Sequence, residues 1–313
     1  MKNEYTCPVC DHANLEVQGA YRGRHQAFLG LHLAHCLSCD LVFASPMPSE
    51  PALMGYNANY FESAHGGQTQ DSAAVSFFTG IAHLRCNHLE QFIDKLGINI
   101  SKILEVGPGL GYFAQCWLER YPETAYFALE TDKTCHASLS KKGVSVLEDA
   151  SCSLIDGNVD LVVLSHVLEH VSDPRSFLKY VTHNLRPGGV LFIEVPCRDW
   201  EHKPFDEPHL LFFDKQPMRC LLEGLGFNDM ELSYHGQEIA HLNSLSWLRA
   251  KWLSLRTRFI KWGCVAPFGY VRHGMECLTD PMQRAVIAPY MAHKKTDNPA
   301  WWLRALSVKS KAI

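Results

Sequence analysis

A glycine loop between a short apolar strand and a helix is the feature that most constrains this chain. The segment KILEVGPGLGYFAQCWLERY, residues 102–121, places glycines at 107, 109 and 111. Glycine lets backbone amides approach a ligand closely, and the helix that follows directs its positive N-terminal end at the same point. Further strand-like runs, AYFALET, VSVLED, VDLVVLS and VLFIEVP, alternate with helical stretches. This alternation predicts a doubly wound α/β sheet with its ligand at the strand ends.

Two acids beside this loop indicate what the ligand carries. A dinucleotide fingerprint would need a glycine at position 112, where the chain has Tyr112. Glu105, two residues before the first glycine, would repel a pyrophosphate but suits a ligand with an ammonium group. Glu130 ends the next strand, where an acid can accept both ribose hydroxyls of an adenosine. The alternative for Glu130 is a solvated surface acid.

Four cysteines near the N-terminus have the spacing of a metal site. Cys7 and Cys10, then Cys36 and Cys39, form two C-x2-C pairs. Two such knuckles can complete a tetrahedral site with no open position, which is typical of structural zinc. We therefore expect a zinc ribbon over residues 1–50, with a role in folding because its loop holds few positive charges. The other cysteines are scattered and are expected to pack in the core.

Charge and composition exclude some classes of protein. The 313 residues have a formal net charge of -4 and a pI near 6.5, which argues against a general nucleic-acid binder. The start of the chain lacks the apolar stretch of a signal peptide, and no run approaches a membrane span. A cytoplasmic location with reduced thiols is the expectation.

The remaining segments are predicted as three units. Residues 51–100 read as a linker followed by a helical segment, with helical spacing over 72–96, and residues 101–235 as the ligand-binding domain. Residues 236–313 are expected to form a C-terminal helical cap. Within it, 241–275 contains no acid and has an apolar helical stripe over 247–262. This stripe could be a docking helix, a basic lid over a diphosphate-bearing substrate, or a peripheral membrane contact.

Three motifs, LEVGPGLGYF, SHVLEHVSDP and LRPGGVLFIEVP, resemble those of the class I S-adenosylmethionine-dependent methyltransferases. The resemblance is closest to a branch with an N-terminal four-cysteine zinc module, associated with sugar and surface-glycan modification. It implies a Rossmann-like seven-stranded sheet whose last strands form an antiparallel hairpin. It also implies cofactor contacts, which fall on Glu105, Gly107, Gly109, Gly111, Glu130, Asp149, Ala150, Ser165 and His166.

The resemblance implies methyl transfer from S-adenosylmethionine to a small polar acceptor, such as a sugar, a nucleotide sugar or a surface glycan. Three other functions compete with it. An RNA methyltransferase is disfavoured by the near-neutral pI, and a nicotinamide-dependent dehydrogenase is disfavoured by Tyr112. A non-catalytic binding protein is the third.

The segment DEPHLLFF, residues 206–213, follows the strand VLFIEVP and resembles the position of the branch's catalytic Glu-His pair. In this chain Pro208 separates Glu207 from His209. Our hypothesis is that His209 takes a proton from the acceptor while Glu207 orients its ring. Alternatively, His209 caps the loop against Asp206, or His170 faces the acceptor instead. Tyr56 and Tyr60 resemble a tyrosine-containing segment that borders the active site, although ordinary aromatic packing would explain them equally well.

Overall fold

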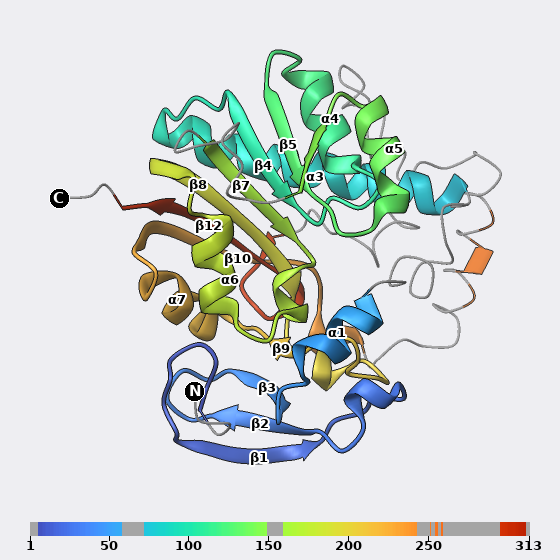
Figure 1. Ribbon diagram of the computed structural model, residues 1–313, viewed down its shortest axis with the longest axis vertical. Helices are drawn as coiled ribbons and strands as arrows, with labels where there is room; N and C mark the ends of the chain where they lie inside the picture. Colours follow the sequence, from blue (N-terminus) through green and yellow to red (C-terminus); the bar gives the residue numbers. More distant parts are fainter. Residues whose placement is uncertain are drawn as a thin grey trace.

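Eight strands form the larger of two sheets among the residues that the computed structural model describes, which are 6–57, 72–148, 159–242, 251, 254, 255, 258 and 295–310 (Figure 1). The order across the sheet is β11-β10-β12-β8-β7-β4-β5-β6. The strands are β4 (Lys102–Val106), β5 (Ala125–Leu129), β6 (Ser145–Leu147), β7 (Val159–Ser165), β8 (Leu185–Pro196), β10 (Phe227–Glu238), β11 (Lys295–Thr296) and β12 (Ala300–Lys309). Neighbours from β6 to β8 are parallel, and β12 runs antiparallel to both β8 and β10.

The chain changes direction across the sheet at β4. From β4 it moves outward through β5 to β6, and it then returns to β7 on the other side of β4. The connections that leave β4 and β7 therefore diverge at the carboxyl ends of these strands. Such a switch point is where open α/β sheets bind their ligands. The predicted doubly wound α/β architecture is thereby confirmed.

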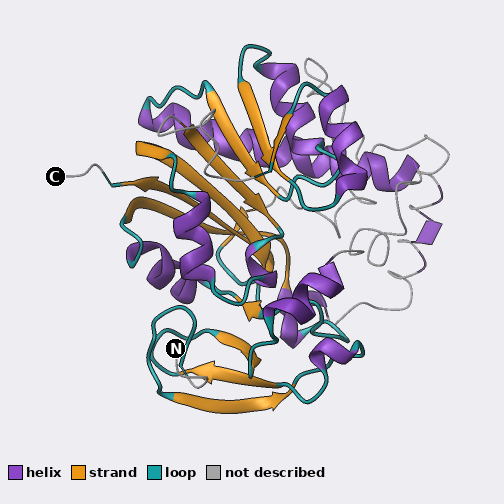
Figure 2. Cartoon of the chain, in the orientation of Figure 1, coloured by secondary structure: helices purple, strands orange, loops and turns teal. Residues whose placement is uncertain are grey.

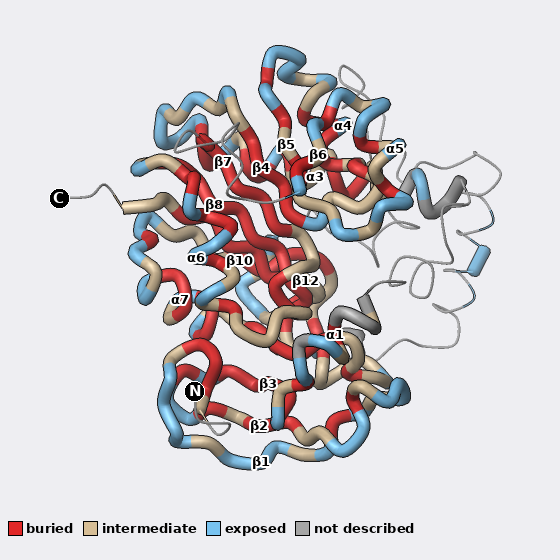
Figure 3. Tube along the Cα trace, viewed as in Figure 1, coloured by how far each residue is buried: buried red, intermediate tan, exposed pale blue. Residues whose placement is uncertain are grey.

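Helices cover both faces of the sheet (Figure 2). Alternate residues of β7 belong to different apolar clusters: Leu161 and Val163 pack on one face, Val162 and Leu164 on the other. The first face is covered by α3 (Ser72–Leu96), α4 (Tyr112–Arg120) and α5 (Lys133–Lys141), and the second by α6 (Pro174–Val181) and α7 (Lys215–Glu223). Burial on both faces explains why the central strands are continuous apolar runs (Figure 3).

The expectations for the ends of this domain are only partly met. The helix predicted over 72–96 is confirmed as α3. The antiparallel hairpin is confirmed as β10 and β12, and the two-residue strand β11 is added at the edge of the seven expected strands. Residues 300–309 are not part of a helical cap, which corrects the prediction for 236–313, because β12 inserts between β8 and β10. Within the described residues, β10 is followed by the short helix α8 (Ile239–Leu242). Most of the stripe over 247–262 lies outside the described residues.

No helix in the described ranges is both long and apolar enough to cross a membrane.

The second sheet is small and joins the N-terminal segment to the loop after β8. Its order is β1-β2-β3-β9, formed by β1 (Leu15–Ala20), β2 (His32–Cys36), β3 (Val42–Ser45) and β9 (Leu211–Phe212). The first three strands come from the predicted ribbon, and the fourth comes from the DEPHLLFF segment. The short helix α1 (Glu50–Asn57) follows β3. The predicted ribbon is therefore tied by a shared sheet to the loop after β8.

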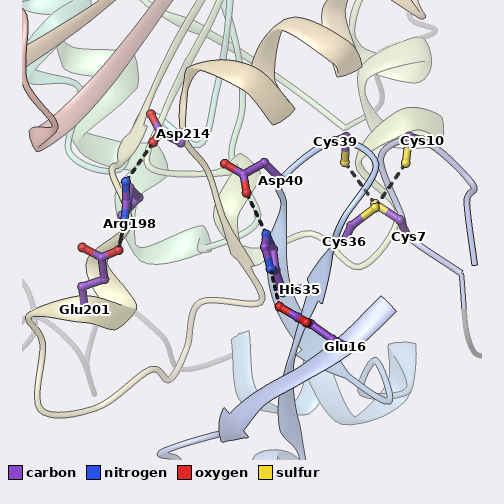
Figure 4. A network of polar contacts seen from close by, with 10 residues as sticks. All are labelled: Cys7, Cys10, Glu16, His35, Cys36, Cys39, Asp40, Arg198, Glu201 and Asp214. Atoms are coloured by element: carbon purple, nitrogen blue, oxygen red, sulfur yellow. Dashed lines mark hydrogen bonds and ion pairs between the residues drawn. The ribbon is translucent and has the colours of Figure 1, made fainter. Parts of the chain in front are cut away.

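The four predicted cysteines meet at one end of this small sheet (Figure 4). The Cys7 and Cys39 sulfurs are 3.5 Å apart, as are those of Cys10 and Cys36. An aspartate with positive φ follows the second cysteine of each knuckle, at Asp11 and Asp40, and its amide bonds back to the carbonyl of the first cysteine. His35 further ties the strands together, since its ring lies between Glu16 and Asp40.

A buried ionic cluster ties the last strand of the chain to the sheet and to α3. Arg304 on β12 lies opposite Glu194 on β8, and its Nε donates to Glu194 Oε2 at 2.6 Å. Arg85 on α3 donates through Nε to the other carboxylate oxygen at 2.8 Å. Burial alone would raise the pKa of this carboxyl, but the two guanidinium groups hold the pKa of Glu194 well below its usual range. The carboxylate of Glu194 therefore ties β8, β12 and α3 together.

Arg304→Met should destabilise the protein by about 3 kcal/mol, because breaking a buried pair leaves an incompletely compensated carboxylate. Arg85 still faces Glu194 in this variant, which keeps the cost at the low end of the range. The free energy of unfolding in urea measures it, and Arg219→Met is the control. Arg219 forms an exposed pair with Glu223, so its loss should cost under about 1 kcal/mol. Equal losses in the two variants would contradict the role given to the cluster.

Candidate active site

A cavity of about 740 Å³ lies at the carboxyl ends of β4, β5 and β7. This volume is in the range of pockets that bury small organic ligands. Seven of the residues predicted to contact a ligand or acceptor line it: Glu105, Gly107, Gly109, Glu130, Ser165, His166 and His170. The wall also contains aromatic side chains that the sequence analysis did not assign to a ligand site, among them Phe78, Tyr112, Phe177 and Trp302. The cavity thus combines an apolar wall with a few acidic and imidazole groups.

The glycine loop forms the floor of the cavity and requires glycine at its first position. Gly107 has φ of +66°, and a Cβ there would lie 2.7 Å from Cγ2 of Val167. Gly109 also has a positive φ, and its amide donates to Glu130 Oε2 at 2.8 Å. Gly111 does not line the cavity. It is the N-cap of α4, with φ of 75°, and so it serves the turn into the helix.

Glu130 is held in place by backbone donors. In addition to Gly109, the Asp132 amide donates to its Oε1 at 2.8 Å. Burial raises the pKa of Glu130, although both amides oppose this shift. Each carboxylate oxygen has two lone pairs, so a bound diol can still donate to the fixed carboxylate. The geometry fits the predicted ribose contact.

Glu105 lies deeper in the cavity wall. Its side chain is buried on β4, where the Tyr126 hydroxyl donates to Oε2 at 2.7 Å. Burial raises the pKa of Glu105 to about 7, against the opposing effects of Tyr126 and Arg85. A carboxyl in this state gains from a nearby cationic ligand, because the cation would favour its charged form.

His166, the residue after β7, has a strained backbone conformation and lies between two acids. Its φ of 57° is in the left-handed region, and its amide donates to the Glu194 carbonyl at 2.8 Å. Its Nδ1 lies 3.2 Å from Glu169 Oε1, and its Nε2 lies 3.3 Å from Glu194 Oε1. Burial alone would lower the pKa of His166, but the two carboxylates raise it. His166 therefore extends the Glu194 cluster to the cavity wall.

The segment predicted to contact an adenine edge is only partly covered. Asp149 and Ala150 lie outside the described residues, whereas the preceding Glu148 lines the cavity.

The acids of DEPHLLFF have other partners than predicted. Asp206 pairs with Arg22 of the ribbon, whose amide and Nε both donate to Asp206 Oδ2, at 2.7 and 3.0 Å. Glu207 accepts from the backbone amides of Arg24 and His25, at 2.6 and 2.9 Å. Both acids thus hold the loop against the ribbon. The prediction that Glu207 orients His209 is wrong, because its carboxylate is committed to those two amides.

The carboxylate that contacts His209 is Asp199. The Asp199 Oδ2 lies 2.6 Å from His209 Nδ1, and Lys203 Nζ lies 2.7 Å from the same oxygen. Burial alone would raise the pKa of Asp199, but His209 and Lys203 hold it well below its usual range. Asp199 lies in η4 (Asp199–Glu201), three residues after β8. The sequence reasoning missed it, since only its place after a strand end could have suggested it.

His170 separates His209 from the cavity. It ends the short 3-10 helix η3 (Leu168–His170), which begins two residues after His166. Its ring lies edge-on to that of His209, with centroids 4.9 Å apart. His170 lines the cavity, whereas His209 does not, and burial lowers the pKa of His170 to about 4. The imidazole is therefore neutral near neutral pH and keeps a lone pair, although the lowered pKa makes it a weaker base than an exposed histidine.

Tyr56 packs against the ribbon. Its ring centroid lies 5.1 Å from that of His25 and 5.0 Å from that of Phe28, which favours aromatic packing over a cavity contact. Tyr60 lies outside the described residues.

Several known proteins are similar in sequence to parts of this chain. A probable S-adenosylmethionine-dependent methyltransferase of Mycolicibacterium smegmatis is 27% identical over 150 residues, which are 45% of this chain and 58% of that protein. The tRNA 5-carboxymethoxyuridine methyltransferase of Escherichia coli K12 is 32% identical over 113 residues, 33% of this chain and 43% of that protein. This chain thus spans about half the length of these curated relatives.

Among solved structures, a methyltransferase of Thermotoga maritima, described as a possible histamine N-methyltransferase, aligns with 74% of this chain and all of its own. The TM-score is 0.43 and the sequence identity 16%. A family model described as a methyltransferase domain matches residues 81–260. Because this match covers more than half of the 313 residues, the chain belongs to the methyltransferase-domain family.

Proposed function

We propose that this protein transfers a methyl group from S-adenosylmethionine to a small polar acceptor that contains a sugar. The observation that carries the proposal is the cavity at the switch point of the sheet, where the glycine loop meets Glu105 and Glu130. A sulfonium nucleoside with an amino-acid tail needs a group that accepts hydrogen bonds from its ribose diol and a carboxylate near its ammonium group. It also needs a loop whose backbone can come close to it. This floor offers all three.

Each of these residues is assigned to a different part of the cofactor. Glu130 accepts the ribose hydroxyls, and Glu105 lies nearest to the ammonium end. Gly107 and Gly109 leave room for the backbone of the loop to contact the methionine part, because a side chain at 107 would meet Val167. The aromatic residues Phe78, Tyr112 and Phe177 supply apolar surface for the adenine and the sulfonium carbon.

The acceptor must lose a proton as it gains the methyl group. The acceptor oxygen or carbon attacks the methyl carbon, the bond from that carbon to sulfur breaks, and S-adenosylhomocysteine leaves as a neutral thioether. An alcohol or a carbon acid needs a positioned base for this step. His170 at the cavity wall and His209 behind it, oriented by Asp199, form the proton-accepting pair.

A paired imidazole base favours hydroxyl or activated carbon acceptors over thiols, which ionise readily without one. Sugars and nucleotide sugars offer such groups, and the resemblance of the N-terminal cysteine module to that of sugar-modifying enzymes points in the same direction. The net charge of -4 further disfavours a nucleic-acid acceptor.

The cysteine cluster is assigned to a structural zinc ion. Its four sulfurs lie within 4.8 Å of one another, and tetrahedral zinc with Zn–S bonds of about 2.3 Å would bring them to roughly 3.8 Å. Four thiolates leave no open position for a substrate. Zinc at this point would stabilise the sheet that also holds the loop of His209.

Glu130→Ala should weaken the binding of S-adenosylhomocysteine by about 2–3 kcal/mol, because the variant loses a charge-assisted contact to the ribose diol. Isothermal titration calorimetry measures this loss. Glu119→Ala, which removes an acid from the surface of α4, should bind as the wild type does. An unchanged dissociation constant for Glu130→Ala would remove the ribose assignment.

His209→Asn should lower turnover by roughly 10²- to 10⁴-fold and leave the affinity for S-adenosylhomocysteine within about twofold, as expected for loss of a positioned base. Turnover is measured on an acceptor found by mass spectrometry of methyl incorporation into sugar nucleotides, cell extracts and RNA. Asp199→Asn should also lower turnover, whereas Glu207→Gln should not, because Glu207 does not contact His209.

Two outcomes would count against this assignment. Normal turnover in both His209→Asn and His170→Asn would remove the imidazole pair from the reaction, and methylation confined to RNA would replace the sugar acceptor.

Cys36→Ser should release zinc and expose residues 6–45 to proteolysis, because the binding energy of structural zinc is also folding energy. The main sheet should survive and still bind S-adenosylhomocysteine. Cys135→Ser, at a buried cysteine of α5, is the control and should keep its zinc. Wild-type protein that is purified without zinc yet resists proteolysis in this segment would overturn the zinc assignment.

A further inference from the structure

Three donor side chains outside the cysteine cluster lie close enough together to hold a metal ion. One ligand atom each of Glu169, His170 and His209 lies within 4.8 Å of the other two. We propose that these residues form a second metal site, for a divalent transition-metal cation such as Zn²⁺. Two imidazoles and one carboxylate are a donor set that such cations prefer, and they leave positions open for water.

Glu169 is a buried carboxylate whose side-chain partners among the described residues are imidazoles only. Its side chain is 1% exposed, and neither carboxylate oxygen accepts a hydrogen bond from the described part of the chain. Its nearest basic neighbour is Nδ1 of His166, at 3.2 Å from Oε1. The His166 contact compensates the burial of Glu169 at one oxygen only, whereas a coordinated cation would compensate the carboxylate more fully.

Both histidines have the arrangement found in metal ligands. Nδ1 of His209 contacts Asp199 at 2.6 Å, and Nδ1 of His170 lies 3.4 Å from the carbonyl of Pro208. When Nδ1 donates to these oxygens, Nε2 of each ring carries the lone pair. A carboxylate or carbonyl on the far nitrogen is the usual support of a metal-bound histidine, since it fixes the tautomer and the ring plane. Nε2 of His170 lies 3.8 Å from Glu169 Oε1, as two ligands of one cation would.

The backbone holds the two segments of the site together. Glu169 and His170 are consecutive in η3, and the Leu210 amide, next to His209, donates to the Glu169 carbonyl at 2.7 Å. His209 is also fixed by its own amide, which donates to the Asp206 carbonyl at 2.9 Å. Nitrogen and oxygen ligands of one zinc ion lie about 3.3 Å apart. Small side-chain rotations would therefore bring the three donor atoms of this site to that spacing.

The second site would oppose the proposed reaction, and this consequence alone rests on the proposed function. A cation bound by Nε2 of His170 and of His209 uses the lone pairs that would otherwise accept the proton. Methyl transfer should therefore fall as this site fills. The binding of the metal itself is independent of catalysis and can be tested without an acceptor.

The test compares the zinc content of the wild type, Glu169→Gln and His170→Ala after equilibration with micromolar Zn²⁺ and gel filtration. The wild type should retain one more equivalent of zinc per chain than either variant. This difference does not depend on how far the cysteine cluster is filled. A crystal of the wild type soaked in Zn²⁺ should show an anomalous peak about 2.0–2.2 Å from Glu169, His170 and His209.

Matched controls separate this site from surface histidines. His183→Ala and Glu123→Gln each remove an exposed side chain of the same type and should keep the zinc content of the wild type. Thermal melts and binding of S-adenosylhomocysteine confirm that each variant is folded. Equal zinc contents in the wild type and in both site variants, or an anomalous peak absent from this cluster, would overturn the proposal. Failure of methyl transfer alone would instead count against the proposed function.

Discussion

The buried carboxylate of Glu194 is the interaction on which the arrangement of the cavity depends. It joins β8 to β12 through Arg304 and to α3 through Arg85, and it lies 3.3 Å from His166 at the end of β7. A carboxylate without these partners could not remain charged in an apolar sheet. The last strand, the helix before the sheet and the cavity wall are therefore coupled, although more than 200 residues separate Arg85 from Arg304 in sequence.

The N-terminal ribbon is more than an attached module. β9 adds to its sheet, and Asp206 and Glu207 bond to the backbone of residues 22–25. The Tyr21 hydroxyl also donates to the carbonyl of His209 at 2.9 Å. These contacts place His209 next to His170. The ribbon therefore supports the position of the His209 imidazole by hydrogen bonds and strand pairing.

The glycine-loop end of the cavity could be predicted from the sequence because its parts are local. Glycines in a strand-to-helix turn and acids at strand ends have fixed positions relative to their own strands, so Gly107, Gly109 and Glu130 meet once the sheet forms. The contacts of His209 could not be predicted in this way. Glu207 precedes His209 by two residues, yet Asp199, ten residues away, makes the contact, because the loop between them folds back over η4.

The sequence by itself determined the doubly wound sheet, the clustering of four cysteines and the edge of the sheet at which the cavity lies. Each of these follows from short-range periodicity or spacing, which does not depend on contacts with distant segments of the chain. Only the tertiary structure decided that residues 300–309 insert between β8 and β10, that Glu194 is neutralised from α3 and β12, and that Glu169 is buried beside two histidines. Such contacts depend on which segments meet across the fold, and no local pattern encodes the partner of a buried charge.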